Sequence, residues 1–205
     1  MKSSATAVLA VLPVLLAARL AHADCDPAPL RAQLDTEARR MDHWRYGWGI
    51  AYGAATVVQL APVVAKYNPF GAYDRDFRDA NLVGAAQSTI ASIASFLAPG
   101  IEVPAPQLDA CADLDALHAA RVKAGASERQ VFWGGHLGNL VLNLGGSAVL
   151  VERTGWSSAL VAFAIGYPIG LLNTYTMPRD SWDAIQIVAT PVADGGLALR
   201  IAGQF

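Results

Sequence analysis

The residues with the clearest capacity for chemistry form a polar face on an otherwise apolar segment. His136, Asn139 and Asn143 are spaced three and four residues apart within 131–151, a run that carries no charged residue. On a helix this spacing places the three side chains on one face. Inside a membrane such a face must turn inward and find partners, and polar residues there are candidates for a functional site.

Two further polar residues lie in the middle of other uncharged runs, where they could meet this face. The candidate buried polar face therefore has five members: Gln59, Gln87, His136, Asn139 and Asn143. The simplest interpretation is that these side chains form hydrogen bonds between helices and fix the register of the helices. The alternative is a pathway for a small polar solute or a proton.

The sequence offers no recognisable catalytic or metal-binding pattern. Its histidines lie far apart, and it holds neither a Cys-x-x-Cys nor a His-Glu-x-x-His arrangement. It also lacks a Gly-x-Ser-x-Gly elbow, and Gly145-Gly146-Ser147 lacks the lysine and the preceding strand of a phosphate-binding loop. We expect no catalytic residue, no metal and no cofactor, and hence a protein that is not an enzyme.

The composition favours a membrane protein or a heavily buried bundle. Hydrophobic residues make up 54% and charged residues 16% of the chain, against about 45–50% and about 25% in ordinary soluble domains. The net charge is −2 and no basic cluster stands out. Nucleic acid is therefore excluded as an expected partner.

The N-terminus predicts export. Residues 1–23 have a positive start at Lys2, an apolar run over 7–18 and a small-x-small ending at Ala21-His22-Ala23, which is typical of a cleaved signal peptide. An uncleaved membrane anchor is the alternative, although the run is short for a spanning helix. Removal of this segment takes away two of the 15 basic residues and none of the 17 acidic ones.

Export makes a disulfide bond between Cys25 and Cys111 the expected state of the two cysteines. Oxidising compartments stabilise such bonds, and two cysteines allow one intrachain pairing. Two free thiols are the alternative.

Four uncharged runs predict apolar helices, namely 47–65, 82–98, 131–151 and 156–176. At 1.5 Å per residue they would span about 25 to 32 Å, close to the hydrocarbon thickness of a bilayer. A polar, cysteine-bearing helix is expected before the first run (24–45) and before the third (108–124). Ser127 is the expected N-cap of the third apolar helix.

The order of these segments predicts an internal repeat. The pattern Trp48-Gly49-x-x-x-Gly53 recurs as Trp133-Gly134-x-x-x-Gly138, and a cysteine precedes each at nearly the same distance. We expect a mainly α protein: a single helical-bundle domain over 24–205, with a first repeat at 24–98 and a second repeat at 108–176.

The C-terminal residues change in character. Apolar residues alternate within 184–192 and 197–205, on either side of Ala193-Asp194-Gly195-Gly196. Alternation around such a turn sequence predicts a short β-hairpin over 184–205.

Taken together, these features predict an exported, multi-pass membrane protein of a bacterial-type cell envelope with a structural or interaction role. Both cysteines would then lie on the oxidising side, although the distribution of Lys and Arg opposes this orientation. Membrane lipid is the expected partner, and a protein partner or a second copy stays open. One alternative is a soluble periplasmic or secreted bundle that binds an apolar ligand such as lipid. Another is a small channel or carrier that uses the polar face around His136.

Overall fold

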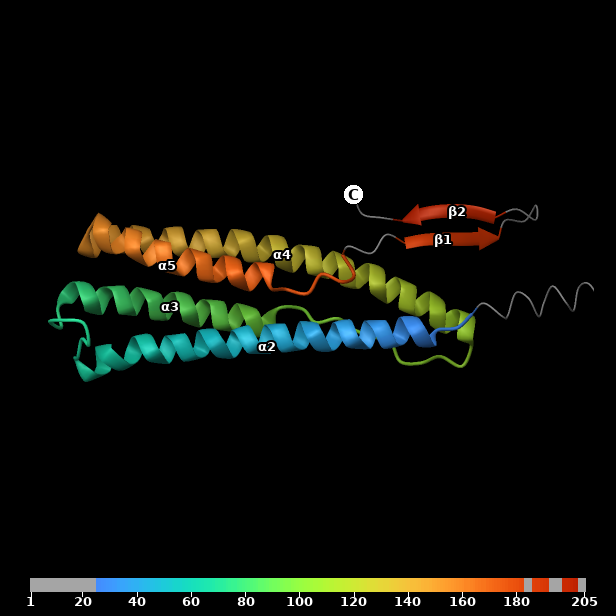
Figure 1. The fold of residues 1–205 in the computed structure, drawn as a ribbon, viewed down its shortest axis with the longest axis horizontal. Helices are drawn as coiled ribbons and strands as arrows, with labels where there is room; N and C mark the ends of the chain where they lie inside the picture. The colour runs from blue at the N-terminus through green and yellow to red at the C-terminus, as the bar shows by residue number, and fades with distance from the viewer. Residues whose placement is uncertain (1–24, 183–185, 192–196, 203–205) are drawn as a thin grey trace, which may run out of the picture.

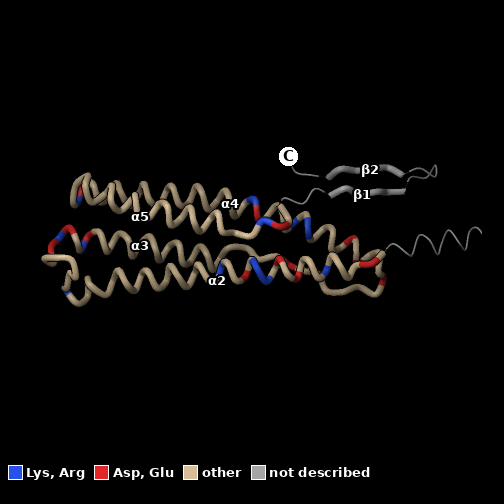
Figure 2. The backbone as a smooth tube through the Cα atoms, in the orientation of Figure 1, with Lys and Arg blue, Asp and Glu red and all other residues tan. Residues whose placement is uncertain are grey.

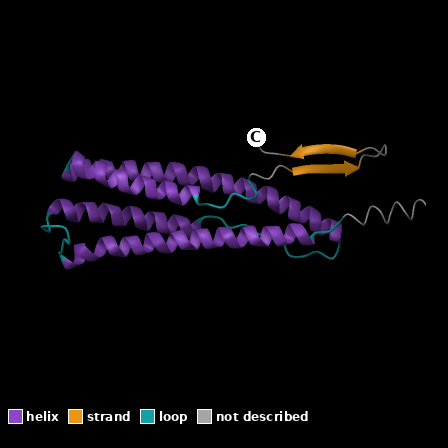
Figure 3. Ribbon diagram, viewed as in Figure 1, coloured by secondary structure: helices purple, strands orange, loops and turns teal. Residues whose placement is uncertain are grey.

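The protein is mainly helical in its computed structural model, which describes residues 25–182, 186–191 and 197–202. Within these ranges four helices account for most of the chain (Figure 3). The expected signal peptide, residues 1–23, lies outside the described residues. Its cleavage therefore stays a prediction.

Two of the helices are much longer than the runs that predicted them. Helix α2 spans Ala28–Ala65 with 38 residues, and α4 spans Ala110–Thr154 with 45 residues. Each joins a polar helix and the following apolar run into one continuous helix. At 1.5 Å per residue these helices extend about 57 and 68 Å, roughly twice the hydrocarbon thickness of a bilayer.

The prediction of a helix start at Ser127 was wrong. The N-cap of α4 is Asp109, whose side chain accepts a hydrogen bond from the backbone N–H of Ala112 at 2.9 Å. The helix then continues through Gly125 and Ser127 without a break. Gly125 lies just after 108–124, the segment that the sequence predicts as a separate polar helix. It is needed within the helix because the backbone of Ser181 packs closely there: a Cβ atom at position 125 would lie 2.9 Å from the backbone oxygen of Ser181.

The two shorter helices fold back along the longer ones. Helix α3 spans Arg75–Leu97, and α5 spans Trp156–Tyr175. The Asp74 side chain caps α3 by accepting from the backbone N–H of Phe77 at 2.8 Å. Gly155 separates α4 from α5 with a φ of 91°, a left-handed conformation that glycine adopts without a Cβ penalty.

The helices form two hairpins that lie side by side (Figure 1). Helix α2 packs along α3, α4 packs along α5, and α3 makes the main contact between the hairpins by packing on α4. The residues of the two expected repeats therefore lie in one hairpin each. We call the N-terminal parts of the long helices, residues 28–46 and 110–130, the extensions, because they run beyond the ends of α3 and α5.

The extensions are joined to each other covalently. Cys25 and Cys111 form the expected disulfide bond, which closes a sequence separation of 86 residues. Beside it, Arg31 donates to Asp113 at 2.6 Å, and this guanidinium holds the pKa of the Asp113 carboxyl below its usual value. Buried apolar side chains fill the space between the extensions, including Leu34, Met41, Leu117 and Phe132.

Two short strands follow the helices. Strand β1, Gln186–Pro191, pairs antiparallel with β2, Leu197–Ala202, and Gln186 lies opposite Ala202. The turn expected at 193–196 lies outside the described residues. The C-terminal β-hairpin over 184–205 therefore stays a prediction as a complete unit.

We predict that loss of the disulfide lowers stability. Replacing both cysteines (Cys25→Ser with Cys111→Ser) should reduce the free energy of unfolding by about 2–4 kcal/mol, because the bond restricts the unfolded chain over a long loop. Thermal unfolding followed by circular dichroism measures the effect. Reductant should reproduce it in the wild type and leave the double variant unchanged, and a wild type insensitive to reductant would contradict the prediction.

Candidate functional site

A cavity of about 1030 Å³ lies between the two hairpins and is lined by residues of all four helices. At one end it is bounded by Asp74 and Phe77, near the start of α3, and at the other by Trp44 and Pro99. It therefore extends along most of the region where the four helices run together. Small and apolar side chains make up most of its lining.

Four of the five predicted polar residues line this cavity: Gln59, Gln87, Asn139 and Asn143. They come from α2, α3 and α4, so the tertiary structure brings together residues that are far apart in the chain. The glutamines and the asparagines thus line the same cavity, although they contact different neighbouring helices.

Each of the four carboxamides rests against a glycine of a neighbouring helix. The pairs are Gln59 with Gly84, Gln87 with Gly146, Asn139 with Gly170, and Asn143 with Gly166. A Cβ atom on Gly84 would lie 3.0 Å from Oε1 of Gln59, and at the other three glycines it would overlap the amide. The glycines therefore provide the room in which the amides cross between helices.

These amides are used for contacts between and within the helices. Gln87 Nε2 donates to the backbone oxygen of Leu142 at 2.7 Å, which links α3 to α4. Asn139 Nδ2 donates to the backbone oxygen of Tyr167 at 3.0 Å, which links α4 to α5. Asn143 Nδ2 donates to Oδ1 of Asn139 at 2.7 Å. This network supports the interpretation that the amides fix helix register.

His136 is not among the residues that line the cavity. Its ring packs edge to face on Phe132, with the ring centres 4.6 Å apart, and on Tyr175 at 5.2 Å. The helical spacing predicted that His136 shares one face of α4 with Asn139 and Asn143. Around His136, however, this face of α4 packs against Tyr175 in the last turn of α5. An aromatic cluster therefore surrounds His136 in place of the amides.

Two buried carboxylates, which the sequence did not single out, lie between the extensions. Glu37 on α2 accepts a hydrogen bond from the Ser181 hydroxyl at 2.5 Å, and Glu128 on α4 accepts one from the backbone N–H of Trp182 at 2.7 Å. Both carboxylates thus bind the segment that follows α5. The close approach of Ser181 to Gly125 belongs to the same contact.

The electrostatic environment of Glu128 is unusual for a carboxylate. Its side chain is 1% exposed, and its Oε1 has no hydrogen-bond partner among the described residues. Burial raises the pKa of Glu128 from 4.5 to about 7, and the negative charges of Glu37 and Asp180 add to the rise. Backbone N–H groups of Trp182 and Ser181 act in the opposite direction.

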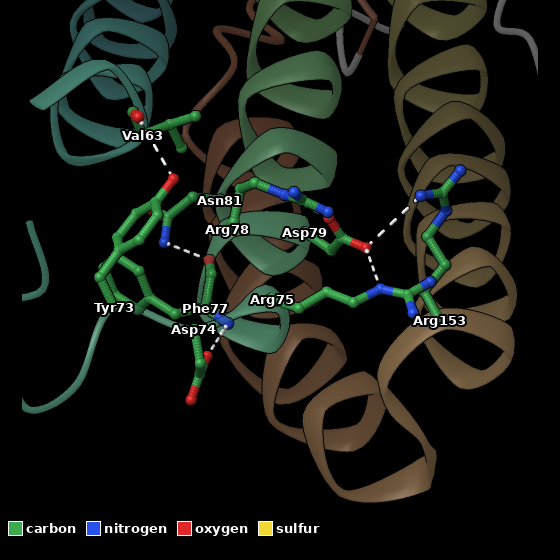
Figure 4. Close-up of polar contacts among 9 residues, drawn as sticks. All are labelled: Val63, Tyr73, Asp74, Arg75, Phe77, Arg78, Asp79, Asn81 and Arg153. Carbon is green, nitrogen blue, oxygen red and sulfur yellow. Dashed lines mark hydrogen bonds and ion pairs between the residues drawn. The ribbon is translucent and has the colours of Figure 1, made fainter. Parts of the chain in front are cut away.

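A cluster of charges joins the hairpins at the opposite end of the bundle (Figure 4). Asp79 on α3 is 2% exposed, and it pairs with Arg78 at 2.8 Å and with Arg153 of α4 at 3.4 Å. Arg75 approaches the same carboxylate at 3.7 Å. The Asp79 carboxylate is shielded from solvent where α3 and α4 meet, and arginines of both helices pair with it.

Within the described ranges, no group of three His, Cys, Asp or Glu side chains lies close enough together to hold a metal ion. Comparison with protein-family models, with curated proteins and with solved structures finds no match to this chain.

We predict that Gly170→Ala destabilises the bundle, because the added methyl group overlaps the Asn139 amide. Overpacking of this kind costs about 1–3 kcal/mol. Gly145→Ala is the matched control on α4, since a Cβ there meets nothing within 4 Å. Thermal unfolding of the purified variants measures both, and Asn139→Ala combined with Gly170→Ala should recover part of the loss. Equal stability of the two glycine variants would contradict the amide–glycine contact.

We also predict that stability falls as the pH rises. Because the folded-state pKa of Glu128, about 7, lies above its ordinary value of 4.5, the folded protein binds more protons between these values. The associated stability is present below pH 4.5 and is lost as the pH rises through about 7. Glu128→Gln should remove this dependence, because the amide carries no charge. It should raise the free energy of unfolding at pH 8 by about 1–2 kcal/mol, a figure that allows for screening of the Glu128 charge by solvent.

Urea unfolding at pH 5 and pH 8 measures this effect. The control is Glu102→Gln, which removes an exposed carboxylate that pairs with Lys123 at 2.6 Å. It should leave the change in stability across this pH range intact. A Glu128→Gln variant with the wild-type pH dependence would show that another group is responsible.

Proposed function

We propose that this protein is a non-enzymatic, multi-pass membrane protein of the cell envelope with a structural or interaction role. The observation that carries the proposal is a broad band of outward-facing apolar side chains around the part of the bundle where the four helices run together. Three of the four described helices, α2, α3 and α5, are long and apolar enough to cross a membrane.

The distribution of charge supports this placement. We call the end of the bundle where α2 connects to α3 and α4 connects to α5 the loop end. Charged residues gather at the loop end and on the extensions, with an uncharged stretch of helix between them (Figure 2). Within this stretch large apolar side chains face outward, for example Val58 at 70%, Leu137 at 63% and Leu160 at 62% exposure. A soluble bundle would hold such residues in its core, so the soluble alternative accounts for this surface less well.

Helix α4 falls outside the set of three, although its run over 131–151 is one of the four uncharged runs that predicted apolar helices. The amides of Asn139 and Asn143 lower the apolar character of its run, but they turn toward neighbouring helices and find partners there. Its outward residues, such as Val141 and Leu144, are apolar. We infer that α4 also crosses the bilayer, with its amides turned toward neighbouring helices and its apolar side chains facing outward, which is how polar residues are accommodated in membranes.

Aromatic residues support the depth of the bundle in the bilayer. Trp133 and Tyr175 are exposed close to the extensions, and Trp156 is exposed at the loop end. Indole and phenol rings favour the headgroup region on both sides of a membrane. The extensions then lie in water, which fits their charged surfaces and buried carboxylates.

The disulfide supports an orientation with the extensions on the oxidising side of the membrane. The bond between Cys25 and Cys111 ties their ends together, and such bonds persist in oxidising compartments. The loop end, with Arg75, Arg78 and Arg153, would then face the cytoplasm. An extension stiffened by a disulfide is suited to contact other envelope components, which is the basis of the proposed interaction role.

The proposal predicts that the protein remains in the membrane fraction after carbonate and high-salt washes and is released by detergent. In a background without cysteines, Asp115→Cys on the α4 extension should react with an impermeant maleimide in intact spheroplasts. Asp76→Cys at the loop end should react only after permeabilisation. Release by carbonate would overturn the membrane placement, and the reverse labelling pattern would overturn the orientation alone.

A further inference from the structure

Two glycines of the cavity wall have no neighbour to make room for. Gly134 and Gly138 of α4 both line the cavity. A Cβ atom on either would meet no atom of the described residues within 4 Å. They differ in this from the four glycines that receive amides. Both glycines are exposed, so the backbone of α4 is bare where the cavity opens at the surface of the bundle.

One hydrogen-bond donor of the cavity wall is unused. Asn173, near the end of α5, lines the cavity, and its Nδ2 is buried without an acceptor among the described residues. Its backbone oxygen accepts from Nε1 of Trp44 at 3.0 Å, which places the donor at the end next to the extensions. A buried donor without a partner is costly, so an occupant that supplies an acceptor would be favoured.

The chemistry of the wall restricts what that occupant can be. Among the described residues that line the cavity there is no Lys, Arg or His, and the carboxylates are Asp74 and Asp76 at the loop end. An anionic group would therefore find no cation inside. An apolar chain with an uncharged carbonyl at the end near Trp44 fits the lining. The volume of about 1030 Å³ lies at the upper end of the range for small-molecule sites.

We propose that this cavity binds a diacyl membrane lipid, with acyl chain against Gly134 and Gly138 and an ester carbonyl accepting from Asn173 Nδ2. The depth is appropriate, because Trp44 and Asn173 lie close to the exposed Trp133 and Tyr175, at the proposed headgroup boundary where lipid esters are found. The inference rests on the proposed membrane placement, which brings the cavity into contact with lipid.

The first test fills the cavity. Protein purified in detergent is titrated with dioleoyl phosphatidylcholine, and bound lipid is counted by native mass spectrometry. Gly138→Leu should weaken binding about 10-fold, because the new side chain occupies the space of the chain. The control Gly145→Leu makes the same change on the same helix, outside the cavity lining, and should bind like the wild type. Equal binding by both variants, or none by the wild type, would overturn the proposal.

The second test addresses the carbonyl. The wild type should prefer the diester lipid over its diether analogue by about 2- to 10-fold, the size of one hydrogen bond. Asn173→Leu should remove this preference while thermal unfolding shows that it is folded. An unchanged preference would overturn the assigned contact. If carbonate releases the protein with lipid still bound, the membrane placement is wrong and the lipid site is retained. If the protein stays in the washed membrane but binds no lipid after purification, the membrane placement is retained and the lipid site is wrong.

Discussion

The seating of a carboxamide on a glycine is the contact on which the packing of the four helices depends, both within each hairpin and between the two hairpins. Gln87 rests on Gly146 and donates to the backbone oxygen of Leu142, so one side chain joins α3 to α4. Asn139 makes the equivalent contact from α4 to α5 through Gly170 and Tyr167. Both require that the second helix present bare backbone, which glycine alone allows. In apolar surroundings such hydrogen bonds fix the relative position of two packed helices, which dispersion forces alone would not specify.

The ends of the bundle are held by contacts of a different kind. At the loop end Asp79 pairs with Arg153, across the junction of α3 and α4. At the other end a disulfide joins the extensions, and Glu37 and Glu128 bind the segment after α5. Ionic and covalent contacts thus lie where charged residues gather, and neutral amides hold the uncharged stretch. This division matches the cost of burying charge away from water.

The cavity and the amide network share one wall but differ in how their glycines are used. Glycines opposite an amide are filled by it, whereas Gly134 and Gly138 face open space. Both kinds look alike in the sequence, as members of small-residue patterns. The role of each glycine depends on which residue of the neighbouring helix lies opposite it. This in turn depends on how the helices are aligned along their axes, which the local sequence does not show.

The sequence by itself determined the mainly helical class and the uncharged runs, because periodicity and composition are local properties. It also predicted the disulfide, since two cysteines allow only one intrachain pairing. It did not determine the continuity of α4 through Ser127, which depends on the packing of Gly125 against Ser181. It also placed His136 with Asn139 and Asn143, whereas the end of α5 surrounds His136 with aromatic rings. The carboxylates Glu37 and Glu128 had no local signal. Only the tertiary structure decided these features, because each depends on which residues of distant segments come to lie opposite one another.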